Sequence, residues 1–457
     1  MKKIIPVFYS EYGRYINRFR AMPSFIDGLK PVERRVLLSL YKEGRKKAVK
    51  SATIVGHCLG HLHPHGDQSL YGTLVNIANQ GYAKGEGNWG SPGLEDAPPA
   101  AYRYTEVSLK KWVDELAFTY LDEKYVPYQE FELEPEPIYL PSPIPIGLIG
   151  HGVITGISFY RTLIPKYKLS DLSKRLSWIL HGKKKKEEII IQPNSRDCTV
   201  SEAEPGEFQK ILTTGIGSIN YTPHGKLESK NIRIQGRAPN SSFNILVNDQ
   251  EKLDINLIDN SSSQIDILVE PKKKSTNLQN LATTVWQEYL IKKLNFNCLF
   301  CDNEGNVEAY GIDNILVYNY NLWKYSVQLK NIDDFNKLSN RKVELMIVQI
   351  IRYIFEQYKS NTVEEIITHF KELKKNTDIS IEIDIFDVDN DIWKKEIKQI
   401  LEQDIIDICN KRTIKNLVET VIDIQKVEKE LLSAKSLIDN CEKNCLDFIT
   451  ELSKGTA

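Results

Sequence analysis

Helical spacing of apolar residues in the C-terminal third most restricts how this chain can fold. Apolar side chains recur at three- and four-residue steps from Val343 to Phe355, which predicts a helix with one dry face. Residues 413–452 repeat this spacing with charges between the apolar positions. Two such helices, separated by a globular stretch at about 376–412, can pair antiparallel. We therefore predict a helical coiled-coil arm with a dimerisation knob in residues 335–457.

Length and composition indicate a folded protein of several domains. The chain has 457 residues, of which 26% are charged and 41% hydrophobic. That is enough for about three domains of roughly 100–200 residues each. No apolar run approaches the roughly 20 residues of a membrane-spanning helix, and the N-terminus does not read as a signal peptide. We expect an α+β multidomain protein in the cytoplasm, with no membrane partner.

The N-terminal segment is strongly basic although the whole chain is nearly neutral. Residues 1–50 carry 13 Lys/Arg and 4 Asp/Glu. Because the whole chain has a net charge of −1, the formal charges of the remaining residues sum to −10. A basic segment of this kind is typical of a protein that binds a polyanion such as DNA. A solvated basic surface is the alternative that charge alone leaves open.

Three short helices are predicted near this basic segment. Asp27-Gly28 is a turn signal and Pro31 suits a helix start, after which the apolar spacing places Arg34 and Arg35 on or beside the exposed face. Further helices are expected at 52–62 and 67–80. Short helices joined by tight turns indicate a helix-turn-helix or winged-helix unit.

The composition of the sequence changes after these predicted helices. Residues 81–99 are rich in Gly and Pro and are predicted to be loop. Short strand-like runs then appear, including residues 189–191, 231–235 and 264–270, with turns at Gly215 and at His224-Gly225. We predict a second, mixed α/β domain at residues 166–334. The Lys183–Lys186 tract reads as a solvated loop that could also touch phosphate.

Cysteines and histidines give no pattern typical of a metal site. Seven cysteines, an odd number, argue against a disulfide framework, and Cys298 and Cys301 lack a second pair, so we expect buried structural thiols. Four histidines lie in GHCLGHLHPHGD, where only Asp67 could complete a ligand set. We expect no metal in this chain, and histidines that donate to phosphate or assist proton transfer instead.

Four strings in fixed order carry a family resemblance. They are DGLKPVERR at 27–35, HPHGD at 63–67, GEGNWG at 85–90 and AAYRYTE at 100–106. Together they closely resemble the breakage-reunion (A-type) subunit of type IIA DNA topoisomerases, as in gyrase and topoisomerase IV. The resemblance is dense over residues 8–165 and continues more loosely to the C-terminal arm. It implies a winged-helix cleavage domain at 1–165, followed by a tower domain and the arm.

The resemblance also implies roles for individual residues. Tyr104 matches the nucleophile that attacks a DNA phosphodiester and holds the 5′-phosphate, and Arg103 matches the arginine that contacts the scissile phosphate. Val153 matches the apolar residue that wedges between base pairs, which is more often isoleucine. The remaining matches are to residues that bind or polarise DNA phosphates, or that accompany them in the basic helix: Arg20, Lys30, Arg34, Arg35, His63 and His65.

Elementary chemistry agrees with a tyrosine in a cationic setting. A phenol has a reference pKa near 10 and is a poor nucleophile at neutral pH unless cations or a base favour its anion. Arg103, Arg35 and His63 would supply such a field and stabilise the phosphorane as its charge builds. Without the resemblance, Tyr104 would be one of 22 tyrosines.

The resemblance implies partners as well. The family uses Mg2+ and ATP, and neither a P-loop nor a fitting acidic D-x-D cluster occurs here, so both are expected on an ATPase/metal-binding B-type subunit. The expected assembly is A2B2, with two copies of this chain forming a homodimer on double-stranded DNA. Because the chain stops after the arm, we expect relaxation or decatenation rather than negative supercoiling. The short form resembles truncated topoisomerase IV-like or bacteriophage subunits, in a bacterial or phage-infected cell.

One departure concerns drug binding. Gln68 and Gly72 stand where the family usually has the serine and acidic residue that anchor quinolones. We therefore expect quinolone insensitivity.

Two other readings of the sequence remain. One is a non-catalytic winged-helix protein that bridges two duplexes with its coiled arm, although such a protein has no need of an arginine-flanked tyrosine. The other is a plain helical scaffold, which leaves the basic N-terminus and the four strings unexplained.

Overall fold

The structure, a computed structural model, divides into two compact units. The first unit comprises residues 1–327 and 442–457, and the second comprises residues 328–441. The predicted Lys183–Lys186 loop and most of the predicted knob lie outside the described residues. The structure describes residues 4–131, 133–182, 187–360, 362–375, 399–411, 413, 416–417 and 424–454.

The three predicted N-terminal helices are confirmed. They are α2 (Pro31–Glu43), α3 (Ser51–His61) and α4 (Asp67–Asn79). A three-stranded antiparallel sheet accompanies them in the order β1-β3-β2, with β1 at Val49–Lys50 and β3 at Glu106–Leu109.

The prediction of loop throughout residues 81–99 is wrong at its start. Ala83–Glu86 form β2, in which Ala83 pairs with Leu109 of β3. Glycine-rich sequence weakens a strand, but the neighbouring β3 supplies hydrogen-bond partners that the local composition does not reveal.

The start of α2 shows why this segment folds as predicted. Gly28 has φ +71°, a left-handed conformation that suits glycine. Pro31 occupies the first turn, and the Lys30 backbone N–H donates to the Glu33 carboxylate at 2.8 Å. The local chemistry therefore fixes where the helix begins.

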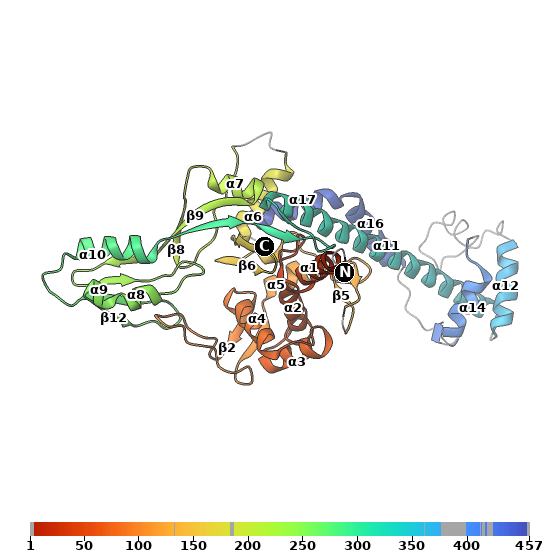
Figure 1. Ribbon diagram of the computed structural model, residues 1–457. Helices are drawn as coiled ribbons and strands as arrows, with labels where there is room; N and C mark the ends of the chain where they lie inside the picture. The colour runs from red at the N-terminus through yellow and green to blue at the C-terminus, as the bar shows by residue number, and fades with distance from the viewer. Residues whose placement is uncertain are drawn as a thin grey trace. The chain divides into compact units, whose positions relative to one another are not determined.

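The first unit also contains two larger sheets, and Figure 1 shows the four-stranded one, marked by β12, at one end of this unit. The five-stranded sheet has the order β6-β7-β14-β9-β8, and the four-stranded sheet has the order β10-β11-β13-β12. The bounds of the five strands are β6 Val153–Ile157, β7 Arg161–Pro165, β8 Cys198–Glu202, β9 Ile216–Pro223 and β14 Lys292–Asn297. Those of the four are β10 Gly225–Leu227, β11 Ile232–Ile234, β12 Ile255–Asp259 and β13 Ile267–Pro271. The five-stranded sheet draws strands from both sides of residue 165, and the three-domain division remains a prediction.

Of the strand-like runs, two are confirmed and one is wrong. Residues 231–235 and 264–270 correspond to β11 and β13, which pair with each other. Residues 189–191 form no strand. The carbonyl of Ile189 accepts a hydrogen bond from the Arg175 guanidinium at 2.8 Å, so the arginine side chain takes the place of a strand partner.

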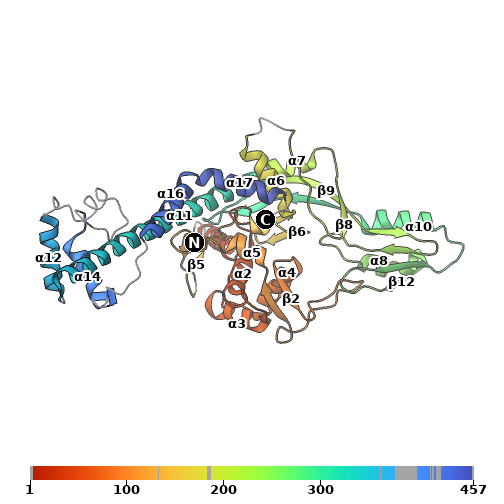
Figure 2. The same ribbon diagram turned by 180° about the vertical axis from the view of Figure 1, so that it is seen from behind.

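The remaining elements of the first unit are short. The helices are α1 Ile4–Ile16, η1 Asn17–Ala21, α5 Lys111–Ala117, η2 Ile146–Leu148, α6 Leu169–Leu180, α7 Glu207–Thr214, α8 Asn244–Asn248, α9 Gln250–Leu253, α10 Leu278–Thr284 and η3 Val285–Leu290. The short strands pair as β4 (Tyr128–Gln129) with β5 (Glu136–Pro137), and β15 (Leu299–Cys301) with β16 (Val307–Ala309). Figure 2 shows these elements from behind.

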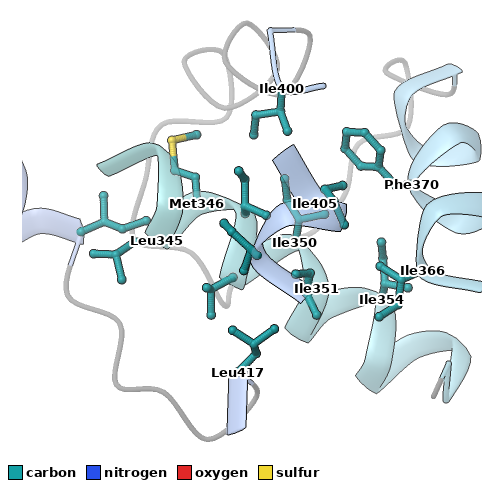
Figure 3. Packing of buried hydrophobic residues seen from close by; sticks show 14 of the residues in the cluster. Leu345, Met346, Ile350, Ile351, Ile354, Ile366, Phe370, Ile400, Ile405 and Leu417 are labelled. Carbon is teal, nitrogen blue, oxygen red and sulfur yellow. The ribbon is translucent and has the colours of Figure 1, made fainter. Parts of the chain in front are cut away.

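The regular secondary structure in the described part of the second unit is helical. Helix α11 (Ile312–Tyr358) begins in the first unit and ends in the second, which confirms the helix predicted from Val343 to Phe355. Its apolar residues share a core with α12 (Val363–Lys375) and α14 (Glu402–Lys411) (Figure 3). Ile350, Ile351 and Ile354 lie at the helical spacing that predicted a dry face.

The predicted helix at 413–452 is interrupted. Its described part forms α16 (Ile424–Asp439) and α17 (Cys441–Lys454), separated at Asn440, whose side-chain amide donates to the Ser436 carbonyl at 2.9 Å. Helices α11 and α16 are antiparallel. Asn331, earlier in α11, contacts Leu437 late in α16, whereas Lys342, later in α11, contacts Glu428 early in α16.

The seven cysteines are free thiols, as expected. Cys298 and Cys301 are buried, and burial raises the pKa of Cys301 to about 12. Among the residues that the structure describes, no helix is long and apolar enough to cross a bilayer.

Candidate functional site

Tyr104 lies on the segment that joins β2 to β3 and is exposed, with 64% of the residue's surface accessible to solvent. The guanidinium carbon of Arg103 stands 4.6 Å from the centre of its ring. A hydrogen bond to Tyr104 raises the pKa of Arg103 above its ordinary value. The predicted pair is thus formed, with the phenol accessible and an arginine held against it.

The start of α3 holds this segment in place. The first N–H groups of a helix have no partner within the helix. Here the Ser51 N–H donates to the Thr105 carbonyl at 2.9 Å, and the Ala52 N–H donates to the Tyr102 carbonyl at 3.2 Å. The Thr105 hydroxyl donates to Ser51 Oγ at 2.8 Å. The residues on both sides of Tyr104 are therefore fixed to one helix end.

Helix α4 adds two contacts from tyrosine hydroxyls. Tyr71 donates to the Ala100 carbonyl at 2.6 Å, and Tyr102 donates to Asp67 Oδ2 at 3.2 Å. Sequence reasoning missed Tyr102 as a residue that anchors this segment. The Tyr-Arg-Tyr repeat could have indicated it, because two tyrosines flank one arginine.

A second set of predicted residues forms around the HPH string. A guanidinium nitrogen of Arg20 lies 3.2 Å from His65 Nε2, and one of Arg35 lies 2.8 Å from His63 Nδ1. The two imidazole rings meet edge to face, with centres 5.2 Å apart. Arg20 and His65 are exposed, whereas His63 is buried.

The prediction that Arg34 and Arg35 lie on or beside an exposed face is wrong. Only 6% of Arg34 and 1% of Arg35 are exposed. Arg35 forms a two-bond ion pair with Glu136 at 2.6 and 2.9 Å, and Arg34 forms one with Asp27 at 2.7 and 2.9 Å. Buried guanidinium groups require such partners, because an unpaired charge is costly in a protein interior.

The two ion pairs have different structural roles. Asp27 also accepts the backbone N–H groups of Leu29 and Leu140, so its pair with Arg34 joins the turn before α2 to a distant segment. Burial would lower the pKa of Arg34, but the charge and hydrogen bonds of Asp27 outweigh it and raise that pKa. Glu136 is the residue that sequence reasoning missed at this site, and its Phe-Glu-Leu-Glu-Pro-Glu-Pro context carries no signal for it.

The two remaining predicted residues are Lys30 and Val153. Lys30 is half-buried directly before α2. Val153 is half-buried at the first position of β6, opposite Pro165 of β7. No group of three or more His, Cys, Asp or Glu side chains in the described ranges is placed to hold a metal ion.

Lys166 is a buried cation that sequence reasoning did not single out. Its Nζ donates to the Tyr82 hydroxyl at 3.1 Å. Burial lowers its pKa to about 8, against partial compensation from Glu33.

We predict that Lys166→Met changes how stability depends on pH. The folded pKa of about 8 lies below the ordinary 10.5, so between these values the unfolded chain binds more protons. The free energy of unfolding of the unaltered protein should therefore rise with pH across this window, by about 3 kcal/mol relative to the variant. Urea unfolding of both proteins at pH 7, 9 and 10.5 measures this, and a difference that stays constant with pH would contradict a buried lysine of lowered pKa.

Comparison with known proteins identifies the chain's relatives. A family model that describes the A-type subunits of DNA gyrase and topoisomerase IV matches residues 20–451. The DNA gyrase A protein of Mycolicibacterium smegmatis is 37% identical over 242 residues, which is 49% of this chain and 27% of that protein. The A-type subunit of DNA topoisomerase 4 from Streptococcus pyogenes serotype M18 is 36% identical over 235 residues, 48% of this chain and 28% of the relative. The corresponding topoisomerase 4 protein from Haemophilus influenzae is 33% identical over 252 residues, 51% of this chain and 33% of the relative. The matched segments thus span a minor part of these relatives' length.

Proposed function

Because the chain belongs to the family of DNA gyrase and topoisomerase IV A-type subunits, we propose that it is the DNA-cleaving subunit of an ATP-dependent type IIA topoisomerase. The observation that carries this proposal is the exposed Tyr104 with Arg103 against its ring. The Tyr104 oxygen attacks phosphorus and the phenol gives up its proton, while the bond from phosphorus to the 3′-oxygen breaks and that oxygen takes up a proton to leave as the 3′-hydroxyl. The 5′-phosphotyrosyl link keeps the energy of the broken bond, so religation by the 3′-hydroxyl needs no further input.

Cations around the tyrosine would favour this step. Arg103 contacts the ring and is exposed, so its guanidinium would stabilise the phosphate as charge builds on it. Arg20 and His65 present exposed donors for the DNA backbone. We assign Arg35 a different role from the expected phosphate contact. It is buried against Glu136 and holds His63 in place, so it acts through that histidine.

The fold is consistent with three parts of the chain that have different roles. We propose that α3, α4 and the β1-β3-β2 sheet form a winged-helix DNA-binding unit within residues 1–165. Residues 166–334 would then be the tower domain, and residues 335–457 the coiled-coil arm and dimerisation region. Lys30 and Arg34 belong to the DNA-facing segment, although Arg34 contributes through its ion pair. Val153, at the start of β6, would be the wedge between base pairs.

The proposed assembly needs a second kind of subunit. Two copies of this chain and two B-type subunits would form A2B2, in which the partner binds ATP and the Mg2+ that assists cleavage. Mg2+ would stabilise charge on the scissile phosphate. We propose relaxation or decatenation of double-stranded DNA as the outcome, in the cytoplasm of a bacterial or phage-infected cell.

The test is a cleavage assay with the full chain, a candidate B-type subunit, duplex DNA and Mg2+. After denaturation, mass spectrometry identifies any peptide that carries a nucleotide. A DNA adduct on Tyr104 that depends on the partner supports the proposal. Tight DNA binding without an adduct under every partner and metal condition would overturn it in favour of a DNA-bridging clamp.

We predict that Arg103→Ala slows cleavage by about 10²-fold while DNA affinity falls no more than about threefold, because the contact matters most as charge develops. Single-turnover cleavage and fluorescence anisotropy measure the two effects. Arg45→Ala is a matched control, since Arg45 also lies over a tyrosine ring, Tyr41, at 4.8 Å. An equal loss of affinity and cleavage would reduce Arg103 to a phosphate anchor.

A further inference from the structure

A small hairpin precedes the tyrosine in the β2–β3 connection. Ser91 and Ala97 exchange two backbone hydrogen bonds at 3.2 and 2.9 Å. We call residues 91–97 the finger. Figures 1 and 2 both show this connection extending from β2 toward β12 of the four-stranded sheet.

The tip of the finger is held on that sheet by three kinds of contact. The Leu94 side chain packs against the hydrophobic cluster of the sheet, and its N–H donates to Asp259 Oδ2 at 2.8 Å. Arg237 donates to Asp96 Oδ2 at 2.8 Å. Residues more than 140 positions apart in the sequence therefore meet here.

The contact is close enough to exclude a side chain. A Cβ on Gly93 would stand 2.7 Å from Asp259 Oδ2 and 3.1 Å from the Glu95 carbonyl. Burial would raise the pKa of Asp259, but hydrogen bonds from Ser261 and Leu94 outweigh it and lower that pKa. The carboxylate at this tight contact is thus charged at neutral pH.

The link from the finger to the tyrosine is short and stiff. Pro98 and Pro99 follow the finger directly, and proline fixes φ near −65°. Ala100, Tyr102 and Thr105 are then bonded to α3 and α4. The segment that carries Tyr104 is therefore held at two ends, by the sheet and by the helices.

We propose that Leu94, Asp96, Arg237 and Asp259 are positioning residues that set Tyr104 for attack, through the docking of the finger on the four-stranded sheet. This inference rests on the proposed cleavage function. These residues do not touch the reacting atoms. Their effect is on alignment, where a displacement of about 1 Å can cost on the order of 10²-fold in rate.

The test compares cleavage rates with DNA affinity in the assembled enzyme. Arg237→Gln should lower the single-turnover cleavage rate about tenfold and Leu94→Ser about 30-fold, with DNA affinity within about twofold. Arg237→Lys should recover most of the rate because it keeps the ion pair. Arg233→Gln is the matched control, since Arg233 lies on β11 of the same sheet and pairs with Glu228 and Asp266 instead.

Hydrogen exchange tests whether the finger is docked on the sheet, separately from whether the enzyme cleaves DNA. Without DNA, the Leu94 amide should exchange faster in Arg237→Gln than in the unaltered chain, whatever the chemistry. If the unaltered enzyme forms the Tyr104 adduct but Arg237→Gln and Leu94→Ser cleave at its rate, the positioning role is overturned while the cleavage function stands. If the unaltered enzyme forms no adduct, the cleavage function fails, and the positioning role with it. If Arg233→Gln slows cleavage as much as Arg237→Gln does, the positioning role is also overturned. The slower cleavage would then result from disturbing the four-stranded sheet and not from undocking the finger.

Discussion

Tyr104→Phe should eliminate the covalent DNA adduct and leave DNA affinity within about threefold of the unaltered protein. The substitution removes one oxygen from a residue that is 64% exposed. The phenylalanine ring keeps the cation–π contact with Arg103 and loses only the hydrogen bond from Arg103 to the phenol oxygen, whereas attack on phosphorus requires that oxygen. Denaturing electrophoresis with labelled duplex measures the adduct, and anisotropy measures affinity.

Tyr102→Phe is the matched control for this prediction. Tyr102 lies two positions away in the same Tyr-Arg-Tyr string and loses only its hydrogen bond to Asp67. It should keep the adduct, with a rate lowered at most about tenfold through weaker anchoring of the segment. An adduct that persists in Tyr104→Phe and disappears in Tyr102→Phe would assign the nucleophile to Tyr102.

The sequence predicts features that depend on near neighbours. Helix α2 was predictable because Pro31 and the turn at Gly28 act within a few residues, and the helix from Val343 because its apolar period is local. Tyr104 was identified through the strings around it. In all three cases, the residues that made the prediction possible are close neighbours in the sequence.

Features that depend on distant partners were not predictable. Arg35 looked exposed because its ion-pair partner, Glu136, lies 101 positions away. The docking of the finger needs Asp259, which is 165 positions from Leu94. A charged residue on a helix is usually solvated, and only the folded chain shows which of them is neutralised in the interior.

The buried pair of Arg35 and Glu136 leads to the largest predicted effect on stability. Glu136→Ala should lower the free energy of unfolding by about 3–5 kcal/mol, because it leaves the Arg35 guanidinium buried without a counter-charge. The Gln129 side chain also loses its bond to Glu136. His63, which Arg35 contacts at 2.8 Å, should lose its fixed orientation. Urea unfolding measures the stability, and the imidazole NMR signals of His63 report the orientation.

Two further variants show whether the uncompensated charge is the cause. Glu134→Ala, two positions away, removes an exposed carboxylate that pairs with His61 and Lys42, and should leave the free energy of unfolding nearly unchanged. The double variant Arg35→Met/Glu136→Leu removes both charges and should recover most of the stability lost in Glu136→Ala, since apolar side chains can replace a buried ion pair. If Glu136→Ala costs no more than Glu134→Ala, Arg35 must reach water in solution. In that case Arg35 would be available to contact DNA phosphate directly, as the family resemblance implies.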